Sequence, residues 1–226
     1  MANDWFRKTS WSEADQADFY AHLKRSRGAG NKAQYLRIQA NYLEGGGSKE
    51  LLRSAIELLD RMLAEYPESF ELASAYGQKA SCLAKLGDLD QAVVYYRRAL
   101  DRERKFPKLR TQAYIAFGRL VVENEMAQFF DEALAVLDEL KITAIQFPQD
   151  IYEMYGIRAI IAAQKGETEK ARELAKVALE AAAKVHSGFR YHPTVGLVHD
   201  RKSKFHKLIE TIAVSPMQRF ARKFLP

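Results

Sequence analysis

The chain has 226 residues, of which 47% are apolar and 28% charged, and its formal net charge is +6. This composition can supply a buried core and excludes a disordered or collagen-like chain, which would be poorer in apolar residues or richer in Gly and Pro. The basic excess is terminal, because residues 184–226 hold nine Lys and Arg against two Asp and Glu. No signal-peptide core opens the sequence, and no run approaches the roughly 18 apolar residues of a membrane span, so we expect a cytoplasmic protein without a membrane partner.

Residues 1–31 are predicted to form an N-terminal capping segment with one helix over residues 12–27. Ser12 begins this helix and Asp15 follows three residues later, which approximates a capping box. Three aromatic residues precede the helix: Trp5, Phe6 and Trp11. We expect these aromatic side chains to seal the apolar end of the helices that follow, and a ligand cage is the alternative.

Helical periodicity runs from residue 32 to residue 186, and turns divide it into four pairs of helices. The expected helices are 32–44 and 49–65, 70–86 and 89–104, 109–126 and 131–143, and 150–165 and 167–186. Two further helices are expected, over 201–213 and 216–224, and no strand is predicted. The single cysteine, Cys82, lies in a helical pattern, where a buried and inert thiol is expected.

The second pair carries the most specific pattern. An aromatic, a small and a large residue at helical spacing are followed by a Gly-Asp turn and then by Ala, an aromatic residue and Ala. These positions are Tyr76, Ala80, Leu83, Gly87, Ala92, Tyr96 and Ala99. Their order resembles the tetratricopeptide repeat. Residues 150–186 fit the same plan well, whereas residues 32–68 and 109–148 fit it loosely because the turns between their helices are longer.

The pairs begin at intervals of roughly 38 to 41 residues, longer than the usual period of about 34. The opening of the chain is also similar to that of many uncharacterised bacterial tetratricopeptide-type proteins. The resemblance implies an all-α fold, a right-handed helical-repeat solenoid of about four helix pairs with N- and C-terminal capping helices. The expected division is a cap over 1–31, repeats over 32–68, 70–107, 109–148 and 150–186, and a basic C-terminal cap over 187–226.

The family usually binds a protein or peptide segment in a concave groove lined by the first helix of each pair. The positions that the resemblance turns toward such a groove include Arg37, Ser81, Lys85, Arg119, Gly156 and Gln164. One subclass grips a terminal carboxylate with paired Lys and Asn, and this pairing is absent from the corresponding positions here. We therefore expect a protein or peptide partner that is not held by its C-terminus.

The segment 187–210 interrupts the helical pattern and, together with His186, contains four of the five histidines. Two interpretations remain open: Phe189, Tyr191 and Val198 fold back over the last repeat, or Arg190, Tyr191 and His192 recognise a ligand. The histidine spacings of six and seven residues across Gly and Pro do not match a zinc site, and no metal is expected.

Three functional classes follow, in order of preference. The first is a non-enzymatic adaptor or regulator that binds a protein or peptide, without a cofactor. The second is a nucleic-acid-associated protein that uses the basic C-terminal residues Arg201, Lys202, Lys204, Lys207, Arg219, Arg222 and Lys223. An enzyme comes last, because no phosphate loop, nucleophile elbow or metalloprotease motif is present. Self-association through the apolar ends of the repeats is a further alternative, which makes a homo-oligomer possible.

Overall fold

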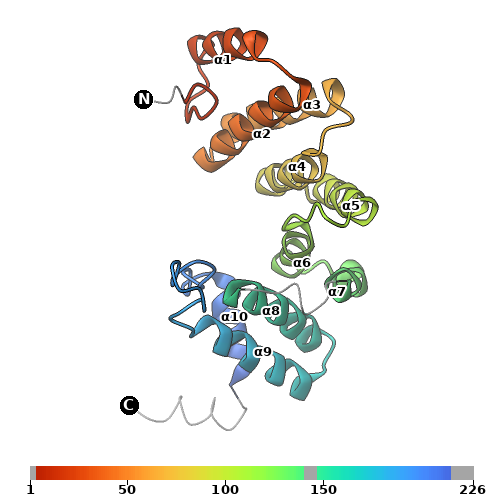
Figure 1. Ribbon diagram of the computed structural model, residues 1–226. Helices are drawn as coiled ribbons and strands as arrows, with labels where there is room; N and C mark the ends of the chain where they lie inside the picture. The colour runs from red at the N-terminus through yellow and green to blue at the C-terminus, as the bar shows by residue number, and fades with distance from the viewer. Residues whose placement is uncertain (1–3, 140–146, 215–226) are drawn as a thin grey trace. The chain divides into compact units, whose positions relative to one another are not determined.

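The computed structural model describes residues 4–139 and 147–214, and these residues contain helices and no strand (Figure 1). The α-helices are α1 (Glu13–Arg25), α2 (Ala29–Gly46), α3 (Lys49–Glu65), α4 (Leu72–Leu86), α5 (Leu89–Lys105), α6 (Ala113–Glu123), α7 (Phe130–Asp138), α8 (Pro148–Gln164), α9 (Thr168–Ala182) and α10 (Lys204–Ala213), and a 3₁₀ turn, η1 (Ala127–Phe129), precedes α7. The all-α prediction is confirmed. The predicted helix over 216–224 lies outside the described residues.

Neighbouring helices pack as hairpins, α2 with α3, α4 with α5 and α8 with α9, and α10 packs on α8 and α9 (Figure 1). This arrangement confirms a tetratricopeptide-like helical-repeat fold. Several helix boundaries differ from the prediction by a few residues, among them the start of α6 and the end of α9. The helix α6 begins at Ala113 because residues 106–109 form a turn and the Thr111 hydroxyl accepts the Ala113 amide hydrogen. The helix α9 ends at Ala182.

The chain forms two compact units, Met1–Ala116 and Phe117–Pro226. In the first unit, the hairpin of α4 and α5 depends on a glycine turn. Gly87 has φ +88°, which favours glycine, and the Asp88 side chain accepts the Gln91 amide hydrogen and so caps α5. Ala80, Ala92 and Ala99 are fully buried, so the two helices approach closely.

The N-terminal segment is held against α1 and α2. Trp5, Phe6 and Trp11 pack on the core of the first unit, as predicted. Ser12 and Asp15 form a complete capping box. The buried Gln39 of α2 binds the non-helical backbone of Lys8 twice, since its amide oxygen accepts the Lys8 N–H at 3.0 Å and its amide nitrogen donates to the Lys8 carbonyl at 2.7 Å. This glutamine therefore fixes a non-helical segment through the main chain alone.

In the second unit, α10 covers the inner face of α8. A Cβ added to Gly156 would lie 2.5 Å from Ile209 Cδ1 and 2.7 Å from Phe205 Cζ, so the absence of a side chain lets α10 lie directly on α8. The repeat register turns Gly156 toward the groove side of α8, and in the structure α10 covers this position. Phe205 and Ile209 occupy that space, because the last repeat needs an apolar cover.

Candidate partner-binding groove

A groove of about 400 Å³ lies on the first unit, between α2, α4 and the start of α6. Its walls are mostly polar or small. The lining residues are Arg37, Asn41, Glu44, Ser74, Gly77, Gln78, Ser81, Tyr96, Thr111, Gln112, Ala113 and Ala116. Gly77 opens the middle of the groove, since a Cβ there would meet only Ala113 Cβ, at 4.0 Å. The groove can therefore accept a polar chain of modest width.

The charges of this groove are matched within the protein. Arg37 forms an ion pair with Glu71, and each side chain is 25% exposed. The Glu44 carboxylate accepts hydrogen bonds from the Ser81 hydroxyl at 2.6 Å and from the Lys85 ammonium at 2.7 Å. The structure thus brings together three of the predicted site residues, Arg37, Ser81 and Lys85, around α2 and α4. A ligand that enters here meets neutralised pairs and no unpaired cation.

Gln78 is one of the lining residues that the sequence analysis did not identify. It is 9% exposed, and neither its amide nitrogen nor its amide oxygen has a hydrogen-bond partner in the structure. A buried amide without partners is unfavourable by about 1 to 3 kcal/mol per unpaired group. A glutamine within a helix next to a predicted groove position was the only available signal, because sequence does not reveal whether a side chain finds a partner.

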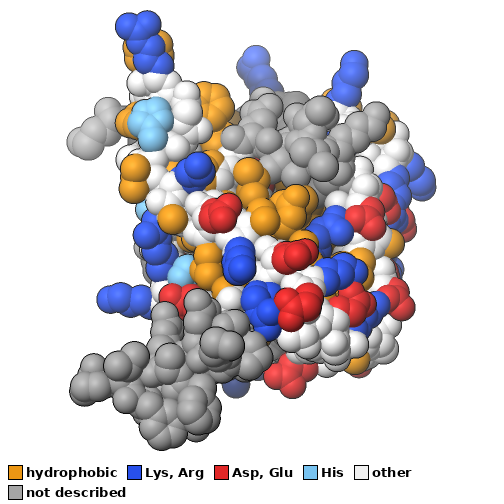
Figure 2. All heavy atoms as spheres, turned by 90° about the horizontal axis from the view of Figure 1, so that it is seen from below, with side chains coloured by type: hydrophobic (Ala, Val, Ile, Leu, Met, Phe, Trp, Pro, Cys, Tyr) orange, Lys and Arg blue, Asp and Glu red, His pale blue; other side chains and the backbone are white. Residues whose placement is uncertain are grey.

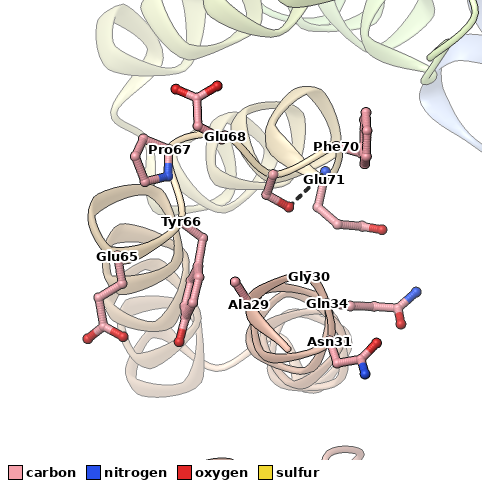
Figure 3. Close-up of a pocket in the computed structure, with 11 residues that line it drawn as sticks. Ala29, Gly30, Asn31, Gln34, Glu65, Tyr66, Pro67, Glu68, Phe70 and Glu71 are labelled. Carbon is pink, nitrogen blue, oxygen red and sulfur yellow. Dashed lines mark hydrogen bonds between the residues drawn. The ribbon is translucent and has the colours of Figure 1, made fainter. Parts of the chain in front are cut away.

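A second hollow of the first unit, about 570 Å³, lies between the start of α2 and the connection from α3 to α4 (Figure 3). Tyr66, Pro67 and the 77% exposed Phe70 form its apolar part. The Ser69 hydroxyl accepts the Glu71 amide hydrogen at 3.1 Å at the start of α4 (Figure 3). Glu71 lines this hollow while its ion-pair partner Arg37 lines the groove, so the ion pair joins the two.

In the second unit, Arg119 belongs to a charge network under α10. Its guanidinium donates to both oxygens of Glu153, at 2.9 and 3.0 Å, and to Glu123 at 3.0 Å, and it lies 3.8 Å from the centre of the Phe205 ring. Burial raises the pKa of the Glu153 carboxyl, and the charge of Arg119 opposes that rise. Arg119 therefore holds α6, α8 and α10 together.

The remaining predicted site residues are exposed. Gln164 ends α8, and Arg190, Tyr191 and His192 lie in the connection between α9 and α10. Tyr191 is 79% exposed, so the expectation that it folds back is wrong, whereas Val198 is buried and Phe189 stacks on Phe147 at 5.4 Å. Within the described part of the chain, no ion pair or hydrogen bond joins Arg119, Gln164 and the connection.

Several Lys and Arg side chains of the repeats form ion pairs with carboxylates, for example Arg158 with Asp138 and Lys170 with Glu167. Figure 2 shows basic and acidic side chains next to one another on one face of the molecule. Over residues 184–214 the structure shows no ion pair of Lys or Arg. Nor do the described residues contain a His, Cys, Asp and Glu cluster that could hold a metal ion.

The reactivity of the Cys82 thiol reports on the packing of α4. Its side chain is fully buried, and burial, assisted by the nearby Glu44 carboxylate, raises the pKa of the thiol to about 12. Only a thiolate is reactive, so we expect the thiol of the folded protein not to react with a disulfide reagent at pH 8. In urea we expect one thiol per chain to react. Fast labelling without denaturant would contradict this packing.

Comparison with known proteins supports the geometric assignment. Helix hairpins that meet through small residues define a helical-repeat protein, and residues 73–106, which span α4 and α5, match the family model described as tetratricopeptide repeat. This segment is therefore similar to the tetratricopeptide repeat, and a repeat of this kind indicates a protein-interaction module. Curated proteins and solved structures gave no match. Among the described residues no helix has the length and apolar character needed to cross a membrane.

Proposed function

We propose that the chain is a non-enzymatic adaptor or regulator that binds a segment of a partner protein in the groove of the first unit. One observation carries the proposal: the tetratricopeptide repeat over 73–106 supplies α4, and α4 lines a groove with α2 and α6. The regular steps between such helices suit an extended or helical ligand. Arg37, Ser81 and Lys85 then act as the polar border of the site, and Phe70 offers an exposed apolar contact beside it.

The test fills the groove without disturbing the fold. Gly77→Leu adds a side chain whose Cβ makes only an ordinary van der Waals contact, with Ala113 Cβ at 4.0 Å, and it replaces the poorest helix former other than proline by a good one. We expect this variant to fold and to lose capture of the partner from the native cell extract by about tenfold or more. The matched control is Gly45→Leu, the same change at an exposed position of α2 with nothing nearby. Equal capture of the partner by wild type, Gly77→Leu and Gly45→Leu would contradict the proposal that the partner binds in this groove.

A nucleic-acid ligand is the second candidate. The basic residues of segment 184–214 favour it, because they form no ion pair with the residues that the structure describes. Lys184, Arg190, Arg201, Lys202, Lys204 and Lys207 lie in this segment. Phosphate contacts by such residues make binding weaken steeply with salt. Nuclease treatment separates the candidates, because capture that is lost on digestion and unaffected by Gly77→Leu assigns the function to this segment instead of the groove.

A further inference from the structure

The two buried glutamines of the first unit differ in one respect. Gln39 uses both polar atoms of its amide to bind the N–H and the carbonyl of Lys8, a residue outside any helix. Gln78, on the next repeat, has the same side chain and comparable burial but no partner for either atom. The protein thus shows, at Gln39, that a buried glutamine can bind the main chain of a non-helical segment through both atoms of its amide.

Gln78 also lies where such a piece of chain can enter. It lines the groove next to Gly77, which leaves room above the helix, and next to Ser74 and Ser81, which are small. Burying an amide without partners opposes folding, and proteins retain few such groups except where function requires them. A ligand that satisfies the amide removes this penalty on binding.

The neutral pairs restrict the chemistry of the ligand. Arg37 is matched by Glu71, and Glu44 is matched by Lys85, so the groove offers no unpaired cation for a terminal carboxylate and no unpaired carboxylate for an amine. A peptide main chain carries a donor and an acceptor on each residue and no charge. It is therefore the ligand chemistry that both Gln78 and the surrounding pairs accept.

We propose that Gln78 binds the main chain of an extended, internal segment of the partner, donating to one carbonyl and accepting one N–H, as Gln39 does with Lys8. This inference rests on the proposed protein-binding function and names the ligand class of that groove. Both amide atoms are covered in the free protein. The proposal therefore requires the Gln78 side chain to turn toward the groove when the segment binds. The partner's side chains set its identity, while Gln78 supplies affinity that is independent of sequence.

Stability measurements on two matched variants form the first part of the test. Gln78→Leu removes an unpaired amide, so we expect its melting temperature to equal or exceed that of the wild type. Gln39→Leu leaves the Lys8 backbone groups without their partners, so we expect its melting temperature to fall. A fall in Gln78→Leu as large as that in Gln39→Leu would show that the Gln78 amide is already satisfied inside the protein, and the inference would be wrong.

Binding measurements form the second part. A library of random 12-residue peptides with blocked ends is selected on the full chain, and the best peptide is titrated against wild type and Gln78→Leu. We expect about tenfold weaker binding by the variant, the loss of one paired buried amide. Each peptide N–H is then replaced by an ester oxygen in turn. One ester should weaken binding to the wild type and have no further effect on Gln78→Leu, which identifies the N–H that Gln78 accepts.

The outcomes separate this inference from the proposed function. Selected peptides that bind the groove, compete with one another and lose affinity with Gly77→Leu, but show no ester position coupled to Gln78, overturn the inference and leave the groove function standing. If no peptide is selected at all, both the inference on Gln78 and the proposed function of the groove are contradicted. A free C-terminus that raises affinity in every selected peptide also overturns the inference, because an internal segment has none.

Discussion

Phe205→Ala is expected to lower the free energy of unfolding of the second unit by about 3 to 4 kcal/mol. The Phe205 side chain is 2% exposed, its ring meets the Tyr152 ring edge-on at 5.6 Å between centroids, and it lies over Gly156. Its removal leaves a cavity between α8 and α10 and takes the aromatic face from Arg119. Urea unfolding followed by circular dichroism gives the change, and hydrogen exchange should locate it in α8 and α10.

The control for this prediction is Phe70→Ala. It makes the same change at a side chain that is 77% exposed, so the free energy of unfolding should change by less than about 0.5 kcal/mol. If Phe205→Ala changes stability no more than Phe70→Ala does, then α10 does not cover α8 in solution. The cover of the last repeat would then have to come from elsewhere.

The helices and their pairing were predictable because their signals are local. Ala80, Ala92 and Ala99 recur at helical spacing, and Gly87 with Asp88 marks the turn between them, so a short window contains the whole pattern. The same holds for the capping box at Ser12. The later start of α6 was harder to predict, because it depends on the Thr111 hydroxyl accepting the amide hydrogen of Ala113, the first residue of the helix.

The site was only partly predictable, because its contacts join distant residues. Arg37, Ser81 and Lys85 were placed near the groove by their register in the repeats, but their partners Glu71 and Glu44 lie 34 to 41 residues away. Sequence therefore suggested available charges where the structure has neutral pairs. Arg119 was assigned to the groove by the same register and instead binds Glu153.

Lys79 shows the same limitation. The tetratricopeptide repeat usually has a large apolar residue at this position, so the register alone places the ammonium either at the groove floor or in water. The structure places the ammonium in an ion pair with Asp60 and 2.8 Å from the Tyr95 hydroxyl, with the residue 7% exposed. A buried ammonium is tolerated there because both partners come from neighbouring helices, α3 and α5.

The network around Arg119 gives a pH-dependent prediction. Burial raises the pKa of Glu153 above its ordinary value, and Arg119 limits the rise. A carboxyl whose folded-state pKa is raised favours folding at pH values below its unfolded pKa, where it is neutral, and this contribution is lost as pH increases through the folded-state pKa. Arg119→Ala removes the positive charge that opposes this rise. The pKa of Glu153 therefore rises further, and ionisation of Glu153 at pH 7 becomes more unfavourable.

Arg119→Ala should therefore destabilise the second unit by about 3 kcal/mol at pH 7, where it leaves a buried carboxylate without its partner. At pH 4.5 the loss should fall to about 1 kcal/mol, which is the contact with the Phe205 ring. Arg158→Ala is the control, because its partner Asp138 is 66% exposed and such surface pairs contribute about 0 to 1 kcal/mol. Urea titrations of both variants at the two pH values test this. A loss for Arg119→Ala that is equal at pH 7 and pH 4.5 would mean that Glu153 is solvated in the folded state, and Arg119 would then be available to a partner as the repeat register suggested.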